Sequence, residues 1–427
     1  MKNIFKFLFV VFCLLTTTNP LLSQWVQNGA DSSYVLSFAV SGTNIFAGTY
    51  DHGIFLSTNN GTSWIQINSG LTLNLNIFNS LVISGTNIFA GSSLGVYLST
   101  NNGTNWTAVN SGLLGNVLAL AVAANGTGGT NLFAGTAVFG GGTTFGGVYL
   151  STNNGTSWTH VNSGITSSNV YSLAVKPNGL SGTNLFAGTD SGAFLSTNNG
   201  TSWTPVNSGL TSPSVLCFAM IGANLFAGTE AINNEPGGIF RSTDNGSTWT
   251  PTGLTNSSIS CFAVSGMNLF AVIGGVGVYL STDNGTNWTQ VNSGLSDFGG
   301  YAFSVAVSAP YLFAGNYNGV WRRPLSEMIT AVNEVESEIP ARFSLLQNFP
   351  NPFNPSTTIS FTLLKRSFVS LEVFNLIGRE VTTIVSEEML AGNYSRQWNA
   401  NNLASGVYFC RLQAGSFTET KKLVLLR

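Results

Sequence analysis

A short unit, Ser-Thr-Asn/Asp-Asn-Gly-x-x-Trp, occurs six times in this chain. The copies begin at Ser57, Ser99, Ser151, Ser196, Ser242 and Ser281. A unit that recurs roughly every 40–50 residues is typical of propellers and solenoids, in which each repeat is one supersecondary element. Residues that recur in every repeat are therefore expected to be structural, and a specific site is expected among the residues that depart from the repeat.

Each repeat contains four short segments rich in β-forming residues, separated by turn sequences such as Ser-Gly-Thr-Asn and Asn-Asn-Gly. In the first repeat these segments are Val35–Val40, Asn44–Gly48, Gly53–Ser57 and Trp64–Asn68. Four antiparallel strands per repeat form one blade of a β-propeller. We therefore expect an all-β protein.

The number of blades follows from counting the second-strand and fourth-strand markers separately. Phe-Ala-Gly or Phe-Ala-Val occurs at Phe46, Phe89, Phe133, Phe186, Phe226, Phe270 and Phe313. The repeat Trp occurs only six times in register, and Trp25-Val-Gln-Asn-Gly precedes the first blade. The last repeat stops at Gly319-Val-Trp-Arg-Arg-Pro. The sequence predicts a seven-bladed β-propeller over residues 24–325, closed by an N-terminal strand that completes the last blade.

The first residues, Met-Lys-Asn-Ile-Phe-Lys, precede a short apolar run from Phe7 to Leu15, which indicates a secretory signal peptide over residues 1–23. We expect no transmembrane segment after its removal, because spanning a bilayer takes about 20 apolar residues. Charged residues make up 7% of the chain and the formal net charge is −2. This balance excludes the basic surface of a nucleic-acid-binding protein, so no nucleic acid is expected as a partner.

The repeated turn resembles the Asp-box, or BNR, repeat of sialidases, sortilin-type receptors and several secreted glycan-active propellers. Four of the six copies carry Asn where that consensus has Asp (Asn59, Asn101, Asn153 and Asn198). The resemblance implies a folding element at the outer blade edge, away from any ligand. The structural residues it implies are Ser57, Gly61, Trp64, Ser242, Asp244, Gly246, Trp249, Ser281, Asp283, Gly285 and Trp288.

The composition changes after the last repeat. Residues 326–341 are acidic and predict a linker, and about seven strands follow in residues 342–427, which favours a small Ig-like β-sandwich. This tail resembles the C-terminal sorting domain of the type IX secretion system. The resemblance rests on Gln347-Asn-Phe-Pro-Asn-Pro-Phe, Asn375-Leu-Ile-Gly-Arg-Glu-Val, Ala404-Ser-Gly-Val-Tyr-Phe and Lys421-Lys-Leu-Val-Leu-Leu-Arg. It implies export to the cell surface or medium, with the translocon and a sorting peptidase as partners of residues 342–427.

The propeller segment contains three arginines, Arg241, Arg322 and Arg323, and the arginine triad of sialidases is not recognisable among them. Alignment of the repeats places Arg241 and Arg322 where the first repeat has Leu56, toward the turn-bearing side. Two histidines and scattered cysteines do not form a metal-binding pattern, so we expect neither a metal nor a cofactor.

The candidate ligand-binding residues lie in loops that follow second strands or connect blades, and these loops share one face of a propeller. Deviating loops on a regular scaffold are where function concentrates. The candidates are Tyr50, Asp51, Asp190, Glu230, Glu235, Asp297 and Tyr317. Acidic groups beside aromatic rings suit sugar hydroxyls, a cation or a basic protein surface.

We therefore expect an exported propeller that binds an extracellular glycan or protein through its loop face. We also expect a monomer without catalytic residues. A glycoside hydrolase or lyase that acts on extracellular polysaccharide through an unrecognised carboxylate pair is the first alternative. A structural or adhesive surface protein is the second.

Overall fold

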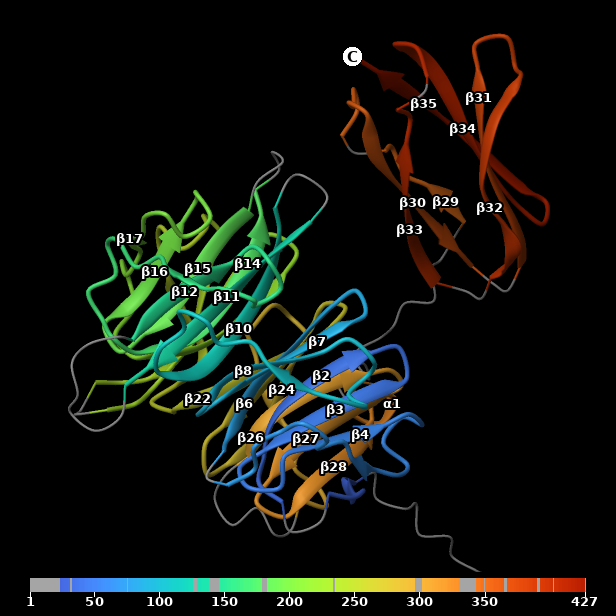
Figure 1. Ribbon diagram of the computed structural model, residues 1–427. Helices are drawn as coiled ribbons and strands as arrows, with labels where there is room; N and C mark the ends of the chain where they lie inside the picture. Colours follow the sequence, from blue (N-terminus) through green and yellow to red (C-terminus); the bar gives the residue numbers. More distant parts are fainter. Residues whose placement is uncertain are drawn as a thin grey trace, which may run out of the picture. The chain divides into compact units, whose positions relative to one another are not determined.

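Short β-strands joined by tight turns build nearly all of the structure (Figure 1). The computed structural model describes residues 24–30, 33–74, 76–125, 129–138, 146–178, 183–232, 235–295, 302–329, 343–348, 350–364, 367–389, 392–401 and 403–426. The chain divides into two compact units at residues 332 and 333, and each unit is treated by itself. The predicted signal peptide lies outside the described residues.

Among the described residues, the first unit contains seven four-stranded antiparallel sheets, numbered 1 to 7 in chain order. Sheets 1 to 3 are β2–β5 (Val35–Ser41, Asn44–Thr49, Ile54–Ser57, Ile65–Gln66), β6–β9 (Phe78–Ser84, Asn87–Ser92, Gly95–Ser99, Thr107–Ala108) and β10–β13 (Asn116–Ala124, Thr130–Ala137, Gly147–Ser151, Thr159–His160). Sheets 4 to 6 are β14–β17 (Val170–Pro177, Thr183–Thr189, Gly192–Ser196, Thr204–Pro205), β18–β21 (Val215–Ile221, Asn224–Thr229, Gly238–Ser242, Thr250–Thr255) and β22–β25 (Ile259–Ser265, Asn268–Ile273, Gly277–Ser281, Thr289–Gln290). Sheet 7 combines β26–β28 (Ala302–Ser308, Tyr311–Asn316, Gly319–Pro324) with β1 (Val26–Gln27).

Strand β1 joins the beginning of the first unit to its end. Val26 pairs with Arg322 and Gln27 with Trp321, as expected from the split of the repeat. The first strand of each sheet contacts the first strand of the next sheet, and β26 contacts β2. The sheets therefore follow one another in a closed order, and the outer edge of β28 is covered by β1.

A glycine in the second strand of most sheets permits this close succession. A Cβ atom added to Gly48 would lie 2.9 Å from the backbone oxygen of Phe78, at the start of the next sheet, and 2.5 Å from the Ser37 hydroxyl. The Phe and Ala that precede this glycine, Phe46 and Ala47, are fully buried. The Phe-Ala-Gly marker thus combines core packing with close approach between sheets.

The repeated turn after the third strand has the same hydrogen bonds in all six copies. In the first copy the Ser57 hydroxyl accepts a 2.8 Å hydrogen bond from the Gly61 amide and donates a 3.0 Å bond to Asn59 Oδ1. Asn60 and Gly61 have positive φ angles of 53° and 75°, a conformation that Asn and Gly tolerate best. The recurring Ser-Thr-Asn-Asn-Gly letters are therefore explained by local turn geometry.

The tryptophan of the repeat connects one sheet to the preceding one. Trp106 donates through Nε1 to the Ile67 backbone oxygen at 2.7 Å, and its amide donates to the Ser69 oxygen at 2.9 Å. Trp158, Trp203 and Trp249 make the equivalent indole bonds to Val109, Val161 and Val206. These indoles thereby stabilise the contacts between successive sheets.

The second unit contains two sheets around one hydrophobic core. Its strands are β29 (Ser344–Leu345), β30 (Ser356–Leu363), β31 (Ser367–Asn375), β32 (Glu380–Met389), β33 (Gly392–Asn399), β34 (Gly406–Ala414) and β35 (Phe417–Leu425). One sheet has the order β29-β30-β33 and the other β32-β31-β34-β35. The core includes Phe361 and Trp398 from the first sheet and Leu371 and Leu412 from the second.

A short helix, α1 (Leu325–Ile329), follows β28, and Leu325 and Met328 are buried in the core of the first unit. The first residues of the predicted linker 326–341 therefore pack against sheet 7. Its residues 330–341 lie outside the described part of the chain. Among the described residues, no helix has the length and apolar character needed to cross a membrane.

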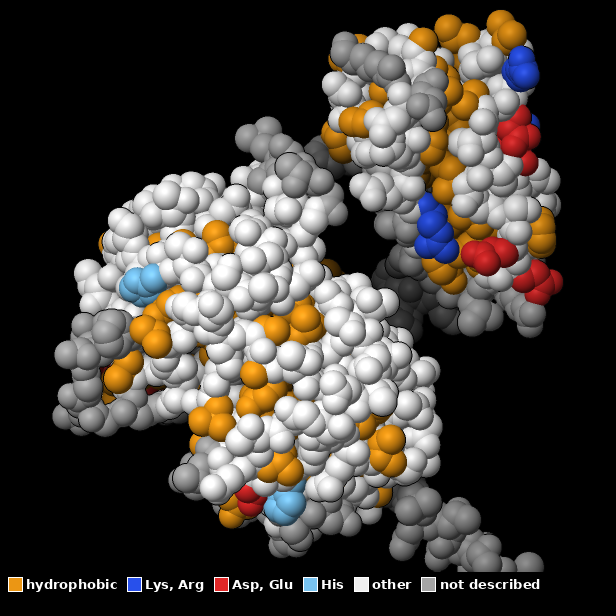
Figure 2. All heavy atoms as spheres, in the orientation of Figure 1, with side chains coloured by type: hydrophobic (Ala, Val, Ile, Leu, Met, Phe, Trp, Pro, Cys, Tyr) orange, Lys and Arg blue, Asp and Glu red, His pale blue; other side chains and the backbone are white. Residues whose placement is uncertain are grey.

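One face of the two units is seen in Figure 2. The first unit shows mostly uncharged side chains there, whereas Lys, Arg, Asp and Glu side chains stand out on the second unit. This difference matches the return of charged residues in the C-terminal sequence.

Candidate functional site at the loop end of the first unit

Every sheet of the first unit has a β-bulge near the start of its first strand. One residue there has no partner in the second strand, and such a bulge bends the strand locally. The bulged residues are Leu36, Asn79, Leu118, Tyr171, Leu216, Ser260 and Phe303. They lie at the end of the sheets that also carries the second-to-third-strand loops, and the repeated turns lie at the opposite end.

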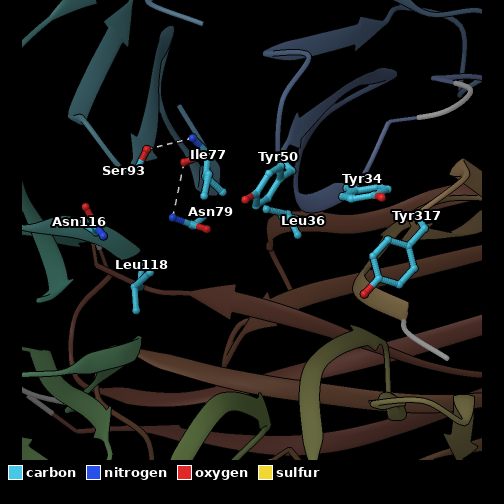
Figure 3. A pocket seen from close by; sticks show the side chains of 9 residues that line it. All are labelled: Tyr34, Leu36, Tyr50, Ile77, Asn79, Ser93, Asn116, Leu118 and Tyr317. Carbon is cyan, nitrogen blue, oxygen red and sulfur yellow. Dashed lines mark hydrogen bonds between the residues drawn. The ribbon is translucent and has the colours of Figure 1, made fainter. Parts of the chain in front are cut away.

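Three tyrosines line a cavity of about 550 Å³ at this end (Figure 3). The ring of Tyr34 contacts Tyr317 edge-to-face at 4.6 Å between centroids and Tyr50 at 5.9 Å. Tyr34 and Tyr50 keep 39% and 48% of their surface exposed. The full lining is Tyr34, Leu36, Tyr50, Ile77, Asn79, Ser93, Asn116, Leu118 and Tyr317, from sheets 1, 2, 3 and 7.

Amide and hydroxyl groups add polarity to one side of the cavity. Asn79 donates through Nδ2 to the Val117 oxygen at 3.1 Å, so its amide orientation is set by the backbone of sheet 3. Ser93 accepts a 3.0 Å hydrogen bond from the Ile77 amide. Figure 3 shows these groups across the cavity from Tyr34 and Tyr317. Mostly apolar walls with a few oriented polar groups are the usual composition of a ligand pocket.

A second hollow of about 590 Å³ adjoins the first and shares Tyr50 and Ile77 with it. Asp51, Leu73 and Asn74 complete its lining. The Asp51 carboxylate lies 2.6 Å from His52 Nδ1, so the two side chains form an exposed pair. The structure thus places three of the predicted residues, Tyr50, Asp51 and Tyr317, in or beside one cavity system.

Two other predicted residues, Asp190 and Glu230, act electrostatically on a different bulged residue, Tyr171. Burial raises the pKa of the Tyr171 hydroxyl, and the nearby charges of Asp190 and Glu230 raise it further. Asp190 accepts hydrogen bonds from Ser167, from Asn169 at 3.0 Å and from Ser191 at 3.2 Å. Ser214 donates a 2.9 Å bond to Glu230. The fold therefore places both carboxylates within electrostatic range of one tyrosine.

Of the last two predicted residues, only Glu235 belongs to the described part of the chain. Glu235 is exposed and lines a hollow of about 240 Å³ together with Ser191 and Thr211. Asp297 lies outside the described residues. In the part of the chain that the structure describes, no three His, Cys, Asp or Glu side chains lie close enough to hold a metal ion.

Sequence reasoning missed Tyr34, Asn79 and Leu118 as lining residues. Asn79 and Leu118 occupy the bulge position, near the start of the first strand of their sheets. An alignment of the repeats shows that the residue type varies at this position, whereas the residue before it is apolar and the residue after it is small in every repeat. That variation is the signal that could have identified them.

The arginines of the first unit serve contacts between sheets. Arg322 donates through Nη1 to the Asn60 oxygen at 2.8 Å, and Arg241 donates to the Asn284 oxygen at 3.3 Å. Both oxygens belong to the repeated turn of the following sheet. The predicted position of Arg241 and Arg322 on third strands, in register with Leu56, is confirmed by their pairing with Phe226 and Phe313.

Solved structures similar to this chain are β-propellers or contain them. YCF48 bound to D1 peptide is 15% identical, with a TM-score of 0.52 and coverage of 71% of this chain and 96% of that chain. A GH74 enzyme from Niastella koreensis is 17% identical, with a TM-score of 0.50 and coverage of 69% and 43%. The WD40 β-propeller domain of Doa1 is 12% identical, with a TM-score of 0.50 and coverage of 70% and 96%. At these identities the likeness shows a propeller-like fold.

Among curated proteins, none matches this chain by sequence. Residues 347–426 match the family model of the secretion system C-terminal sorting domain, which confirms the prediction made from the four sequence motifs. The C-terminal residues of this protein therefore form a type IX sorting domain, and the protein is exported to the cell surface or the extracellular space.

Proposed function

We propose that this protein is an exported seven-bladed β-propeller that binds an extracellular glycan or protein at the loop end of the ring. The observation that carries the proposal is the cavity lined by Tyr34, Tyr50 and Tyr317. Its volume, its apolar walls and its few oriented polar groups are those of a binding pocket. Tyrosines that keep part of their surface exposed supply large, rigid contact area for a ligand.

The proposed architecture rests on the sheet order. Seven four-stranded sheets in closed succession, with β1 in sheet 7, support seven blades over residues 24–325. The hydrogen bonds of the repeated turn support its assignment as an Asp-box with a structural role. Two sheets around one core support an Ig-like sandwich for residues 342–427.

Delivery to the site of action depends on the second unit. The sorting domain implies interaction with the type IX secretion system. We propose that a sorting peptidase then removes residues 342–427, so that the propeller acts at the cell surface or in the medium.

Binding of the purified full-length protein to extracellular polysaccharides and cell-surface proteins tests this function. We expect a ligand whose binding is lost when Tyr34 is replaced, because Tyr34 contacts both other tyrosines. Tyr34→Ala is compared with Met267→Ala, a change of an exposed side chain in the turn between β22 and β23 at the opposite end of the sheets. Binding that survives Tyr34→Ala would place the ligand elsewhere and contradict the proposal.

A glycoside hydrolase is the second candidate, because Asp190 and Glu230 lie near the same tyrosine and glycosidases use paired carboxylates. A GH74 enzyme is also among the structures with a similar fold. Release of reducing sugars from polysaccharides, lost in both Asp190→Asn and Glu230→Gln, would establish this activity. Binding without any release of product would favour the binding protein.

A further inference from the structure

Two hollows adjoin at Tyr50 and are together called the groove below. Tyr50 and Ile77 line both of them; the first lies near the bulged ends of the first strands, and the second is bounded by Leu73 and Asn74. Each hollow has the volume of a small-ligand site, roughly 300–1,000 Å³. An occupant that fills both must be extended and must cross the ring of Tyr50.

The walls of this groove are nearly uncharged. Among the described side chains that line the two hollows, Asp51 alone carries a charge, and its carboxylate is paired with His52 at 2.6 Å. An acidic ligand would lose its hydration in the groove without gaining an opposite charge, which is costly. The one carboxylate that a basic ligand could meet, Asp51, is already paired with His52. The groove therefore selects a neutral occupant.

The polar groups of the groove are side-chain amides placed next to aromatic rings. Asn79 uses its nitrogen for the Val117 and Ile77 oxygens, at 3.1 and 3.5 Å, which leaves Oδ1 as an acceptor. Asn116 lies in the same hollow and Asn74 in the next. Amides can donate to and accept from hydroxyl groups. Rings that stay exposed beside them can cover an apolar face of a ligand.

Resting on the function proposed above, we propose that the groove binds a neutral oligosaccharide that stacks one sugar unit on Tyr50. A sugar ring presents an apolar C–H face with hydroxyl groups at its rim, which matches an aromatic ring flanked by amides. An extended peptide would instead need partners for backbone N–H and C=O groups along its whole length. The hydroxyl-rich, uncharged ligand fits the groove better.

Arrays of neutral oligosaccharides, acidic oligosaccharides and peptides, probed with the full-length protein, test this inference. The strongest ligand is then titrated calorimetrically against Tyr50→Ala, Tyr50→Phe and Asn79→Ala, with Met267→Ala as the control. We expect a neutral oligosaccharide whose affinity falls roughly tenfold or more in Tyr50→Ala, because the stacked surface is lost. In Tyr50→Phe the affinity stays within about threefold, because the ring remains.

The two proposals fail in different ways. A peptide or an acidic oligosaccharide whose binding falls in Tyr50→Ala would overturn the neutral-sugar inference and leave the binding function standing. Absence of binding on every array, or binding that Tyr50→Ala and Asn79→Ala both leave unchanged, would overturn the proposed function as well. Because Tyr50→Phe keeps the packing with Tyr34, it separates loss of binding from loss of folding.

Discussion

The indole of Trp25 donates a 2.6 Å hydrogen bond to the backbone oxygen of Val291, a residue 266 positions later in the chain. The Trp25 amide also donates to the Ser293 oxygen at 2.8 Å, and a Cβ on Gly294 would meet the Trp25 backbone. Trp106 makes the same contacts with Ile67 and Ser69 within the unit. The beginning of the first unit is therefore fixed to sheet 6 by the contact that joins internal sheets.

Replacement of Trp25 by alanine should open this junction. Trp25 is 2% exposed, so we expect Trp25→Ala to lower the free energy of unfolding by about 3–5 kcal/mol, the usual cost of removing a buried aromatic side chain. Denaturant titration of the full-length protein measures the change. Val26→Ala is the control, because Val26 is 55% exposed in the adjacent position. Equal effects of the two substitutions would show that the contact between Trp25 and sheet 6 does not stabilise the closed succession of sheets.

At two of the contacts between neighbouring sheets, the repeat tryptophan does not donate to the preceding sheet, and an arginine connects the two sheets instead. The Trp288 indole donates to Gly285 in its own turn, at 2.9 Å, and the buried Trp64 Nε1 has no hydrogen-bond partner. At these two junctions Arg241 and Arg322 reach the Asn284 and Asn60 oxygens. The arginines occupy the sheets that precede the two exceptional tryptophans.

We expect Arg322→Ala to lower the free energy of unfolding by about 1–3 kcal/mol, since a charged donor to a carbonyl is lost. The guanidinium also lies 4.7 Å from the centre of the Tyr311 ring, a contact that a lysine cannot reproduce with the same planar geometry. Arg322→Lys should therefore recover only part of the loss. Calorimetric melting of the three proteins measures this order, and wild-type stability of Arg322→Ala would refute the bridging role.

The repeated turn of sheet 5 should be sensitive to acid. Hydrogen bonds from the Thr248 side chain, the Thr248 amide and the Ser242 hydroxyl lower the pKa of Asp244 to about 2. Because this pKa is depressed in the folded state, the stabilisation is complete above about pH 4 and is lost as the pH falls toward about 2. Asp244→Asn should remove this dependence, because the other turns form with Asn at the same position.

Unfolding free energies measured from about pH 5 to about pH 2 test this expectation for wild type and Asp244→Asn. Asp283 supplies a second case. Burial acts to raise its pKa, but hydrogen bonds from Asn287 and Ser281 outweigh burial and lower the pKa. In the double variant Asp244→Asn, Asp283→Asn, the free energy of unfolding should therefore depend on pH even less than in Asp244→Asn. If the free energy of unfolding changes with pH in the same way in all three proteins, these two carboxylates do not contribute to the acid sensitivity.

The sorting domain motif around Asn351 covers the edge of the last strand, β35. Asn351 donates to the Lys422 oxygen at 3.1 Å and accepts from the Val424 amide at 2.8 Å, and Phe353 donates to the Val424 oxygen at 2.9 Å. Gln347 also donates to the Lys422 oxygen, at 2.7 Å. The motif thus protects a strand edge that would otherwise be free to pair with another chain.

Asn351→Ala should expose this edge and lower the local stability of β35 by about 1–3 kcal/mol, because two hydrogen bonds to the β35 backbone are lost. Hydrogen exchange of the β35 amides measures the effect locally, and the amount of exported protein shows its consequence for secretion. Gln413→Ala, at an exposed position of β34, is the control. Unchanged exchange at Val424 would refute the edge-covering role of Asn351.

Much of the fold could be predicted because its determinants lie close together in the sequence. The predicted strand Val35–Val40 is observed as Val35–Ser41, and Asn44–Gly48 as Asn44–Thr49, since alternating burial and turn residues act within a few positions. Pairing of the Trp25 segment with the last sheet followed from an incomplete repeat. The sorting domain was predicted from four motifs, each of them a short run of residues.

The candidate site could be predicted only in part. Tyr50 and Tyr317 stood out because they follow second strands in loops that differ between repeats. Tyr34 did not, because its importance comes from packing against both of them. Asp190 and Glu230 were predicted separately, and only the structure places both beside Tyr171.

The sequence by itself determined the strands, the repeated turns and the export route, because period-two burial, positive-φ Asn and Gly positions and contiguous motifs are local properties of a chain. Only the tertiary structure decided where a cavity forms. Asn79 belongs to sheet 2, whereas Tyr34 precedes the first strand of sheet 1 and Tyr317 lies in a turn of sheet 7. Their side chains line one cavity only when β26 lies beside β2 and β1 completes sheet 7. That arrangement depends on contacts between residues far apart in the sequence, which local patterns do not specify.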